Sequence, residues 1–292
     1  SKDVEGRYQS VTGLQADIKR CLDQLEMKVE IEKFSLGKSD QSGRFLIPSK
    51  LYGRDQQINT LLNSFGRLGT ETKEITLIAG HSGTGKTSLV YESHKPITRQ
   101  KGIFLSGKHE QLQKDKPYIA IAQAFQGFFN LILSENEQVL AYWKKRIRKS
   151  LGKEGKLITD LIPNLELVIG KQPPLDALGL KESQNRFNYV FLKFISTLAT
   201  EKHPLVMFID DLQWADIASL ELLHSIILKE DLNFFYFIGS YRDNEIGESH
   251  PTKLIFDQIA KKGIQTHLIN LSGLNESNAC ELIQDTFSLN EE

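Results

Sequence analysis

Short apolar runs alternate with longer amphipathic segments along most of the chain. Five of these runs read as buried strands, at residues 74–79, 102–106, 205–209, 234–239 and 266–271. β-Branched and aromatic residues are frequent in them, as is typical of strands that are covered on both faces. Apolar positions at helical spacing occur between them, in residues 118–133, 137–151, 183–200, 217–228 and 253–260. Strands that alternate with helices predict an α/β fold of three layers around a five-stranded, mostly parallel sheet.

The regions outside this alternation divide the chain further. Residues 1–28 predict an amphipathic N-terminal helix, with apolar side chains on one face at Leu14, Ile18, Leu22 and Leu25. Residues 152–182 contain Pro163, Pro173 and Pro174 and read as an irregular insertion. We therefore expect four parts, which are an N-terminal segment (1–33), an extended linker (34–50), the α/β domain (51–268) and the start of a helical domain (269–292).

Composition and charge exclude several classes of protein. The chain of 292 residues is 40% hydrophobic and 25% charged, as is usual for globular proteins that bury a sizeable core. Its 36 Lys and Arg residues against 37 Asp and Glu residues argue against a dedicated nucleic-acid binder, which usually has a basic excess. No apolar run approaches the roughly 18 residues that span a bilayer. Cys21 and Cys280 lack the spacing of a zinc site. We expect a cytoplasmic protein without a membrane partner, cut from a longer chain.

Residues 80–87, with the sequence Gly-His-Ser-Gly-Thr-Gly-Lys-Thr, match the phosphate-binding loop G-x-x-x-x-G-K-[ST]. A predicted strand precedes the loop and a predicted helix follows it, which is the context the motif requires. Glycines allow successive backbone N–H groups to point at one anion, and the helix N-terminus adds partial positive charge. The alternative is a glycine-rich turn with an exposed lysine. The loop residues expected to bind a nucleoside triphosphate are Gly80, Ser82, Gly83, Thr84, Gly85, Lys86, Thr87 and Ser88.

Two acidic residues provide the second half of the expected site. Asp210 and Asp211 end the apolar run that starts at Leu205. Mg²⁺ prefers few carboxylates together with water and phosphate oxygens, so we expect Thr87 and Asp210 to hold it. Asp211 is a candidate to orient or deprotonate an attacking water, although most fast ATPases of this layout carry a glutamate there. Because an off-position base lowers the rate steeply, we expect slow hydrolysis. The alternative is a solvated acidic turn.

Arg242 follows the fourth predicted strand and faces the same edge of the sheet. It is a candidate to sense the γ-phosphate through charge-assisted hydrogen bonds, together with the catalytic candidates Lys86, Asp210 and Asp211. The alternative is a surface arginine paired with Asp243. We expect Trp214 to be a packing residue. The basic cluster at 144–149 reads as a solvated helix face.

In combination, these motifs resemble the STAND class of AAA+-related P-loop ATPases. The matching segments are Leu51–Arg54, Gly80–Thr87 and Phe208–Asp216. The resemblance implies that Tyr52, Gly53 and Arg54 lie near the adenine and that Arg242 is a phosphate sensor. It also implies ATP and Mg²⁺ as cofactors.

Further segments resemble the ATPase part of large bacterial sensor kinases, in which a serine/threonine kinase domain precedes the ATPase, and a GAF domain and a histidine kinase follow it. These segments are Phe34–Gly37, Arg44–Pro48, Ile169–Pro174 and Tyr241–Glu245. Residues 1–33 resemble the end of the preceding kinase domain, and 269–292 the start of a truncated helical domain. No kinase active-site motif is present in the sequence.

The resulting hypothesis is a regulatory ATPase that acts as a nucleotide-dependent switch within a sensor kinase. Its expected partners are ATP or ADP and the neighbouring kinase and sensor domains, with a nucleotide-dependent oligomer left open. One alternative is a nucleotide-binding scaffold that does not hydrolyse ATP. Another is a DNA-associated ATPase similar to origin recognition proteins, which the charge balance disfavours.

Overall fold

The structure is a computed structural model and describes residues 8, 11–27, 31–37, 50–70, 73–113 and 116–287. It divides into two compact units, each described by itself below. The larger unit is Gly53–Gly273, and the smaller one combines Ser1–Tyr52 with Leu274–Glu292.

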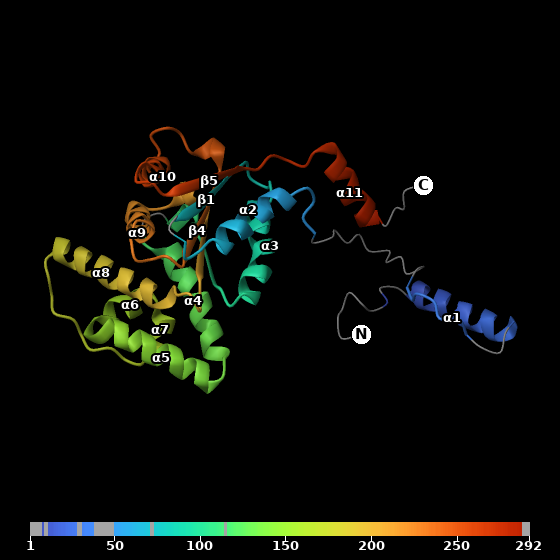
Figure 1. The fold of residues 1–292 in the computed structure, drawn as a ribbon, viewed down its shortest axis with the longest axis horizontal. Helices are drawn as coiled ribbons and strands as arrows, with labels where there is room; N and C mark the ends of the chain where they lie inside the picture. Colours follow the sequence, from blue (N-terminus) through green and yellow to red (C-terminus); the bar gives the residue numbers. More distant parts are fainter. Residues whose placement is uncertain are drawn as a thin grey trace. The chain divides into compact units, whose positions relative to one another are not determined.

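The larger unit is built on a five-stranded sheet (Figure 1). Its strands are β1 (Glu74–Ala79), β2 (Ile103–Lys108), β3 (Leu205–Asp210), β4 (Phe235–Tyr241) and β5 (Gln265–Asn270). They lie in the order β2-β3-β4-β1-β5, and every neighbouring pair is parallel. The predicted α/β class and five-stranded sheet are therefore confirmed. Because all the strands run the same way, their C-terminal ends lie at one edge, where ligands of open α/β sheets bind.

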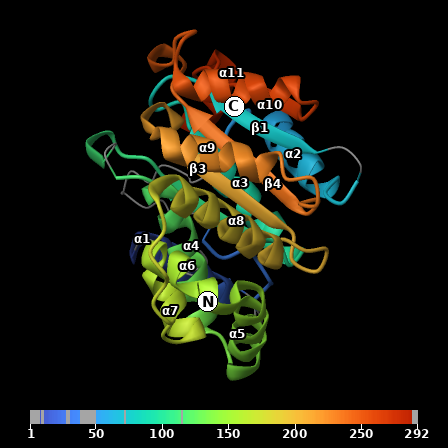
Figure 2. The ribbon, with the colours of Figure 1, turned by 90° about the vertical axis from the view of Figure 1, so that its left-hand side faces the viewer.

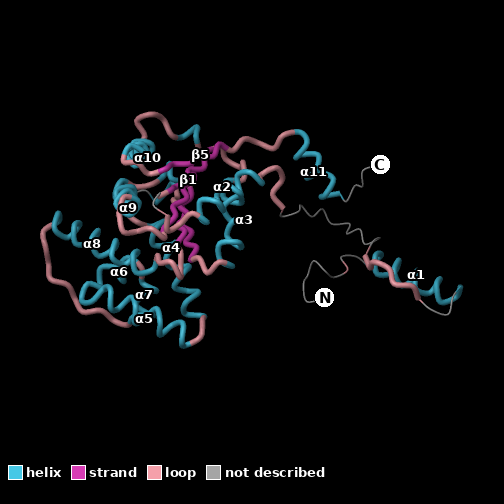
Figure 3. Tube along the Cα trace, in the orientation of Figure 1, coloured by secondary structure: helices cyan, strands magenta, loops and turns pink. Residues whose placement is uncertain are grey.

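Helices cover both faces of this sheet and complete the three layers. The helices α2 (Asp55–Gly66) and α3 (Lys86–Arg99) pack together on one face, and α9 (Ile217–Ile227) and α10 (Pro251–Lys261) on the other (Figure 1). Figure 3 shows the strands enclosed between these helices. Every residue of β1 and β3 is buried, as parallel strands under two helical layers must be.

A helical segment between β2 and β3 forms a second packed region (Figure 2). It contains α4 (Ile119–Ser134), α5 (Glu137–Leu151), α6 (Gly155–Leu161), α7 (Pro163–Ile169) and α8 (Leu180–Leu198). The rings of Phe125 and Phe194 lie 5.3 Å apart between α4 and α8. Such aromatic pairs add to the free energy gained from burial alone.

The expectation that residues 152–182 are irregular is wrong for most of that stretch. Residues 155–161 and 163–169 form α6 and α7, and only Ile162 and residues 170–179 lack regular structure. Pro163 lies in the first turn of α7, where the missing N–H of proline has no helical partner to lose. Leu165, Val168 and Ile169 are buried, so tertiary packing stabilises helices too short to form alone.

The smaller unit contains two helices among its described residues. In one part, α1 (Val11–Met27) is joined to the following segment because Asp17 Oδ2 accepts hydrogen bonds from the Tyr8 hydroxyl at 2.7 Å and from the Gly37 N–H at 2.6 Å. The predicted apolar positions of α1 are 41–53% exposed. In the other part, α11 (Glu276–Phe287) is bound to the chain around Lys50, whose Nζ lies 2.5 Å from Glu281 Oε1. Residues 38–49, including the Arg44–Pro48 segment, and residues 1–7 lie outside the described residues.

Among the described residues, no helix has both the length and the apolar character needed to cross a membrane.

Candidate functional site

The loop at Gly80–Thr87 connects the C-terminal end of β1 to the first turn of α3. Gly85 immediately precedes α3 and has φ 88° and ψ 20°, a left-handed conformation that strains any residue with a Cβ. Gly83 has φ 80°. These two glycines bend the backbone so that the free N–H groups at the start of α3 face a cavity of about 300 Å³.

Lys86 is buried within this loop, with 7% of its surface exposed. Its Nζ donates hydrogen bonds to the carbonyl oxygens of Gly80 and His81, each at 2.7 Å. Burial lowers the pKa of Lys86, while the nearby carboxylates of Asp210 and Asp211 oppose that shift. The buried ammonium group is thus hydrogen-bonded to two carbonyl oxygens of the phosphate loop, and these bonds offset the cost of burying its charge.

Asp210 connects the loop to β3 and β4. Its Oδ2 accepts a hydrogen bond from the Thr87 hydroxyl at 2.6 Å, and its Oδ1 accepts bonds from the Ser240 hydroxyl and from the Asp211 N–H. The carboxylate is 4% exposed and lies beside the Thr87 oxygen. A hydroxyl and a carboxylate at the edge of a phosphate-loop cavity fit the ligand set that Mg²⁺ prefers. Bound Mg²⁺ would neutralise phosphate charge there.

Asp211 is held by three side chains. Lys108 Nζ lies 3.1 Å from its Oδ2, Gln213 Nε2 donates to its Oδ1 at 2.9 Å, and Arg242 Nε is 3.8 Å from the same Oδ1. Asp211 also has φ 57° and ψ 48°, which is uncommon for a residue other than glycine. The contacts with Lys108, Gln213 and Arg242 engage both carboxylate oxygens of Asp211.

Arg242 lies directly after β4, beside the strand that carries the loop. Its guanidinium lies 4.8 Å from the ring centre of Trp214, and its Nη1 is 2.8 Å from Glu245 Oε1. The Trp214 indole N–H donates to the other Glu245 oxygen at 3.0 Å. Arg242 therefore has structural partners in Asp211, Glu245 and Trp214, and the alternative pairing with Asp243 is not what the structure shows.

The cavity brings together most of the residues expected from the sequence. Its lining comprises Ser82, Gly83, Gly85, Lys86, Thr87, Ser88, Lys108, Asp210, Asp211 and Arg242. Gly80 and Thr84 belong to the loop without lining the cavity. Arg54 contacts the loop through a long hydrogen bond of 3.5 Å from its Nη2 to the Thr84 carbonyl, and donates to the Ser272 carbonyl at 2.5 Å. The Tyr52 hydroxyl donates to Asp285 at 2.8 Å. The adenine contacts of Tyr52, Gly53 and Arg54 stay a prediction.

Three residues of the site were missed by the sequence analysis, namely Lys108, Gln213 and Ser240. Lys108 in β2 pairs in register with Asp210 in β3. Ser240 is the second-last residue of β4, two positions before Arg242. A polar residue at the C-terminal end of a strand beside β3 was the available signal. It was overlooked because the second strand was predicted to stop at Ser106, two residues short of Lys108.

With this geometry in view, the family can be assigned. The profile of a family described as AAA ATPase domain matches residues 50–233. The chain belongs to that family. This AAA ATPase domain is 35% identical over 242 residues to Hybrid signal transduction histidine kinase G of Dictyostelium discoideum, a match that covers 76% of the chain and 7% of that protein. It is 22% identical over 209 residues to Peroxide stress-activated histidine kinase mak3 of Schizosaccharomyces pombe, covering 58% of the chain and 9% of that protein.

The chain thus spans less than a tenth of the length of these curated relatives. Among solved structures, Cdc6p from Pyrobaculum aerophilum matches with a TM-score of 0.47 and 12% identity, covering 83% of this chain and 51% of that one. The Aeropyrum pernix ORC1 protein, solved in complex with DNA, matches with a TM-score of 0.40 and 12% identity, covering 82% and 50%.

Proposed function

We propose that this AAA ATPase domain binds ATP with Mg²⁺ and acts as a nucleotide-dependent switch within a longer histidine-kinase chain. The observation that carries the proposal is the 2.6 Å hydrogen bond between Thr87 and Asp210, which are 123 positions apart in sequence. It joins the phosphate loop to the acidic strand end, so the two halves of an ATP and Mg²⁺ site meet at one place.

Each residue of the cavity has a role in this proposal. The backbone N–H groups of residues 82, 83 and 85–88 and the Lys86 ammonium would bind the β- and γ-phosphates. Thr87 and Asp210 would hold Mg²⁺ and Asp211 would orient water. Arg242 would respond to the γ-phosphate by exchanging its contacts with Asp211 and Glu245 for charge-assisted bonds to phosphate oxygens.

Slow hydrolysis is part of the proposal. Asp211 is shorter than the glutamate of fast ATPases, and Lys108 and Arg242 flank its carboxylate. The shorter side chain places the carboxylate away from the position that a glutamate would reach, and the two contacts engage the oxygens that would accept a hydrogen bond from water. The same contacts favour a second candidate function, a scaffold that binds ATP without hydrolysing it. Phosphate release by the chain in Mg²⁺ and saturating ATP separates the two, because only the switch gives turnover that Asp211→Asn abolishes.

The wider context is also proposed. The two histidine-kinase relatives support a place within a two-component signalling chain, with the neighbouring kinase and sensor domains as partners. Membership of the STAND class, a cytoplasmic location and a bacterial source stay predictions from the sequence, and the two curated relatives come from Dictyostelium discoideum and Schizosaccharomyces pombe.

Calorimetric titration with ATP and Mg²⁺ tests the site. We expect Lys86→Ala to weaken binding at least tenfold, about 1.4 kcal/mol. Lys95→Ala, on the exposed face of the same helix, is the matched control and should bind like the unmodified chain. Equal affinity of the Lys86 and Lys95 variants would remove the assignment.

A further inference from the structure

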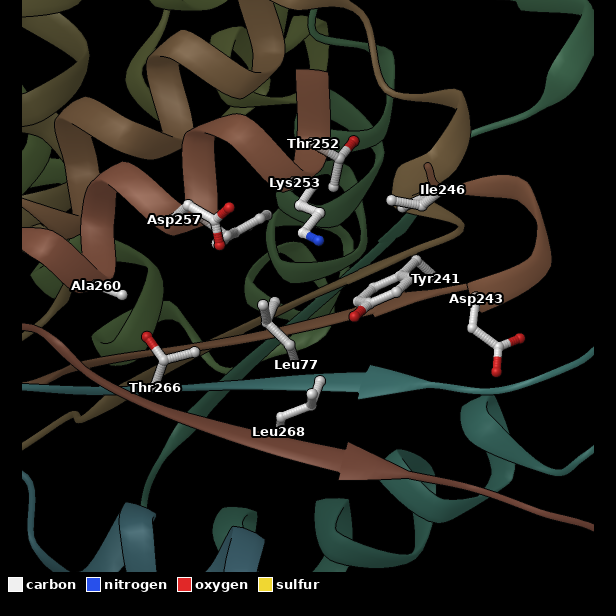
Figure 4. A pocket seen from close by; sticks show the side chains of 11 residues that line it. Leu77, Tyr241, Asp243, Ile246, Thr252, Lys253, Asp257, Ala260, Thr266 and Leu268 are labelled. Atoms are coloured by element: carbon white, nitrogen blue, oxygen red, sulfur yellow. The ribbon is translucent and has the colours of Figure 1, made fainter. Parts of the chain in front are cut away.

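A groove between α10 and the outer strand β5 is separate from the phosphate-loop cavity. It has a volume of about 320 Å³, and none of its lining residues lines the other cavity. Figure 4 shows Leu77 and Leu268 on the sheet side and Ala260 on the α10 side. Leu268 is 55% exposed, although it lies in the middle of a strand. Exposed apolar side chains gathered in a groove often mark a site where another molecule binds.

The outer edge of β5 offers unpaired backbone groups beside this groove. The Gln265 N–H donates to the Lys73 carbonyl at 3.0 Å and the Leu271 N–H to the Ala79 carbonyl at 2.8 Å, so these residues face β1. Because a parallel ladder bonds alternate residues to one neighbour, the N–H and C=O groups of Thr266, Leu268 and Asn270 point away from β1. No strand among the described residues pairs with that edge.

Two residues of β5 belong both to its free edge and to the groove. Thr266 and Leu268 line the groove through their side chains and direct backbone donors and acceptors outward. A peptide laid along β5 in extended form would receive backbone hydrogen bonds, and every second side chain would face the groove. Unpaired edges with this layout are templates for an added strand.

Charge and hydrogen-bonding groups define the chemistry of the occupant. Asp243 and Asp257 are exposed and line the groove, whereas the lining cation Lys253 is paired with Glu248. The remaining charge is therefore negative and complements a basic side chain. The Tyr241 hydroxyl also lines the groove, and burial raises the pKa of Tyr241, so it stays a protonated donor for a peptide carbonyl.

We propose that this groove binds an extended segment of a partner protein, which adds a sixth strand to β5. The segment carries an apolar side chain that packs on Leu77 and Leu268, and a basic side chain two positions away that faces Asp257. This interaction goes beyond the proposed ATP site, because none of the residues that line this groove lines the phosphate-loop cavity.

A displayed library of nine-residue peptides, selected on the immobilised 292-residue chain, tests the proposal. Selection on Leu268→Asp removes peptides that bind elsewhere. We expect enriched sequences to alternate apolar and basic residues with a spacing of two. In fluorescence anisotropy, Leu268→Asp should weaken their binding at least tenfold, and Leu254→Asp, on α10 outside the groove, should not. Asp257→Lys should reverse the preference from lysine to glutamate.

The strand geometry has its own signature. Methylation of the peptide backbone nitrogens one at a time should weaken binding at every second position, because only alternate N–H groups face β5. Equal effects at all positions, equal binding to Leu268→Asp, or no enrichment over the counter-selection would overturn the proposal. So would concentration-dependent dimerisation of the chain that Leu268→Asp abolishes, since the occupant would then be a second copy.

Discussion

At the scale of single residues, Asp210 is the centre of the candidate site. It is buried, and its two carboxylate oxygens accept three hydrogen bonds from Thr87, Ser240 and its own neighbour Asp211. A buried carboxylate that loses a donor is left with part of its desolvation cost uncompensated. The position of Asp210 therefore depends on β4 as much as on the phosphate loop.

Removing the β4 donor tests this dependence. We expect Ser240→Ala to lower the free energy of unfolding by about 1–3 kcal/mol, since Asp210 Oδ1 loses a buried hydroxyl partner. Urea denaturation measures the change. Ser225→Ala removes a hydroxyl that bonds only its own helix, to the Glu221 carbonyl, and should change stability by less than about 0.5 kcal/mol. Equal effects of the two variants would contradict this role of Ser240.

The same residues show what a sequence pattern can predict about a site. Gly80–Thr87 and Asp210 were predictable because a loop or a strand end fixes their geometry locally. Lys108 and Ser240 were not, because their place beside Asp210 and Asp211 depends on which strands are neighbours and in which register. Short-range spacing contains no information on that order.

At the scale of elements, β2 and α4 approach each other unusually closely. A Cβ built on Gly107 in β2 would lie 1.9 Å from the carbonyl oxygen of Ala120 in α4. Because that oxygen belongs to a helix backbone, it cannot move aside without displacing α4. The contact fixes how the helical segment 119–198 sits on the sheet edge that carries Lys108.

Alanine substitutions at two glycines, one in β2 and one in α4, should therefore change the stability of the fold in opposite directions. Gly107→Ala should destabilise the fold by about 1–3 kcal/mol through overpacking. Gly127→Ala lies within α4, where a Cβ would meet nothing within 4 Å, and should stabilise it by about 0.5–1 kcal/mol through higher helix propensity. Thermal and urea unfolding of the two variants measure both signs. A neutral Gly107→Ala would show that the helix is not held at this distance.

A second contact between elements predicts a pH dependence. Arg67, after α2, donates to both oxygens of Glu74 at the start of β1, at 2.5 and 2.6 Å, and His267 of β5 lies 3.0 Å from the same carboxylate. These hydrogen bonds, led by that of Arg67, lower the pKa of Glu74 from 4.5 to about 2. The ionised form is favoured in the folded state, so this stabilisation is complete above pH 4.5 and is lost as the pH falls toward 2.

Comparison with Glu74→Gln isolates that effect. The chain should be more stable than the variant at pH 7, by at most on the order of 3 kcal/mol and less in salt, because Arg67 is partly exposed. The difference should shrink steadily below pH 4.5 in urea unfolding. Glu201→Gln, at an exposed turn, is the control and should show no such trend. A difference independent of pH would contradict the assignment to Glu74.

At the scale of the whole molecule, the sequence predicted the core architecture better than its surroundings. Alternation of apolar runs and helices located all five strands, with β1 predicted at its observed bounds. It missed α6 and α7, because helices of 7 residues carry little periodicity and depend on packing, that of α7 against α4 and α5 and that of α6 against α7 and α8. It also left open that β5 is an edge strand of the sheet, which a sequence pattern does not encode.

The larger unit offers one measure of the proposed site as a whole. Thr87 belongs to α3 and Asp210 to β3, so a ligand bound by both stabilises the folded unit and not the unfolded chain. ATP and Mg²⁺ at 100 times the dissociation constant should add about 2.7 kcal/mol to the free energy of unfolding, seen as a higher melting temperature. Chelation of Mg²⁺ should remove much of that shift.

Thr87→Ala should remove the Mg²⁺-dependent part, whereas Thr98→Ala, near the other end of α3, should retain it. A shift that survives both chelation and Thr87→Ala would mean that the nucleotide binds without the metal site proposed for Thr87 and Asp210.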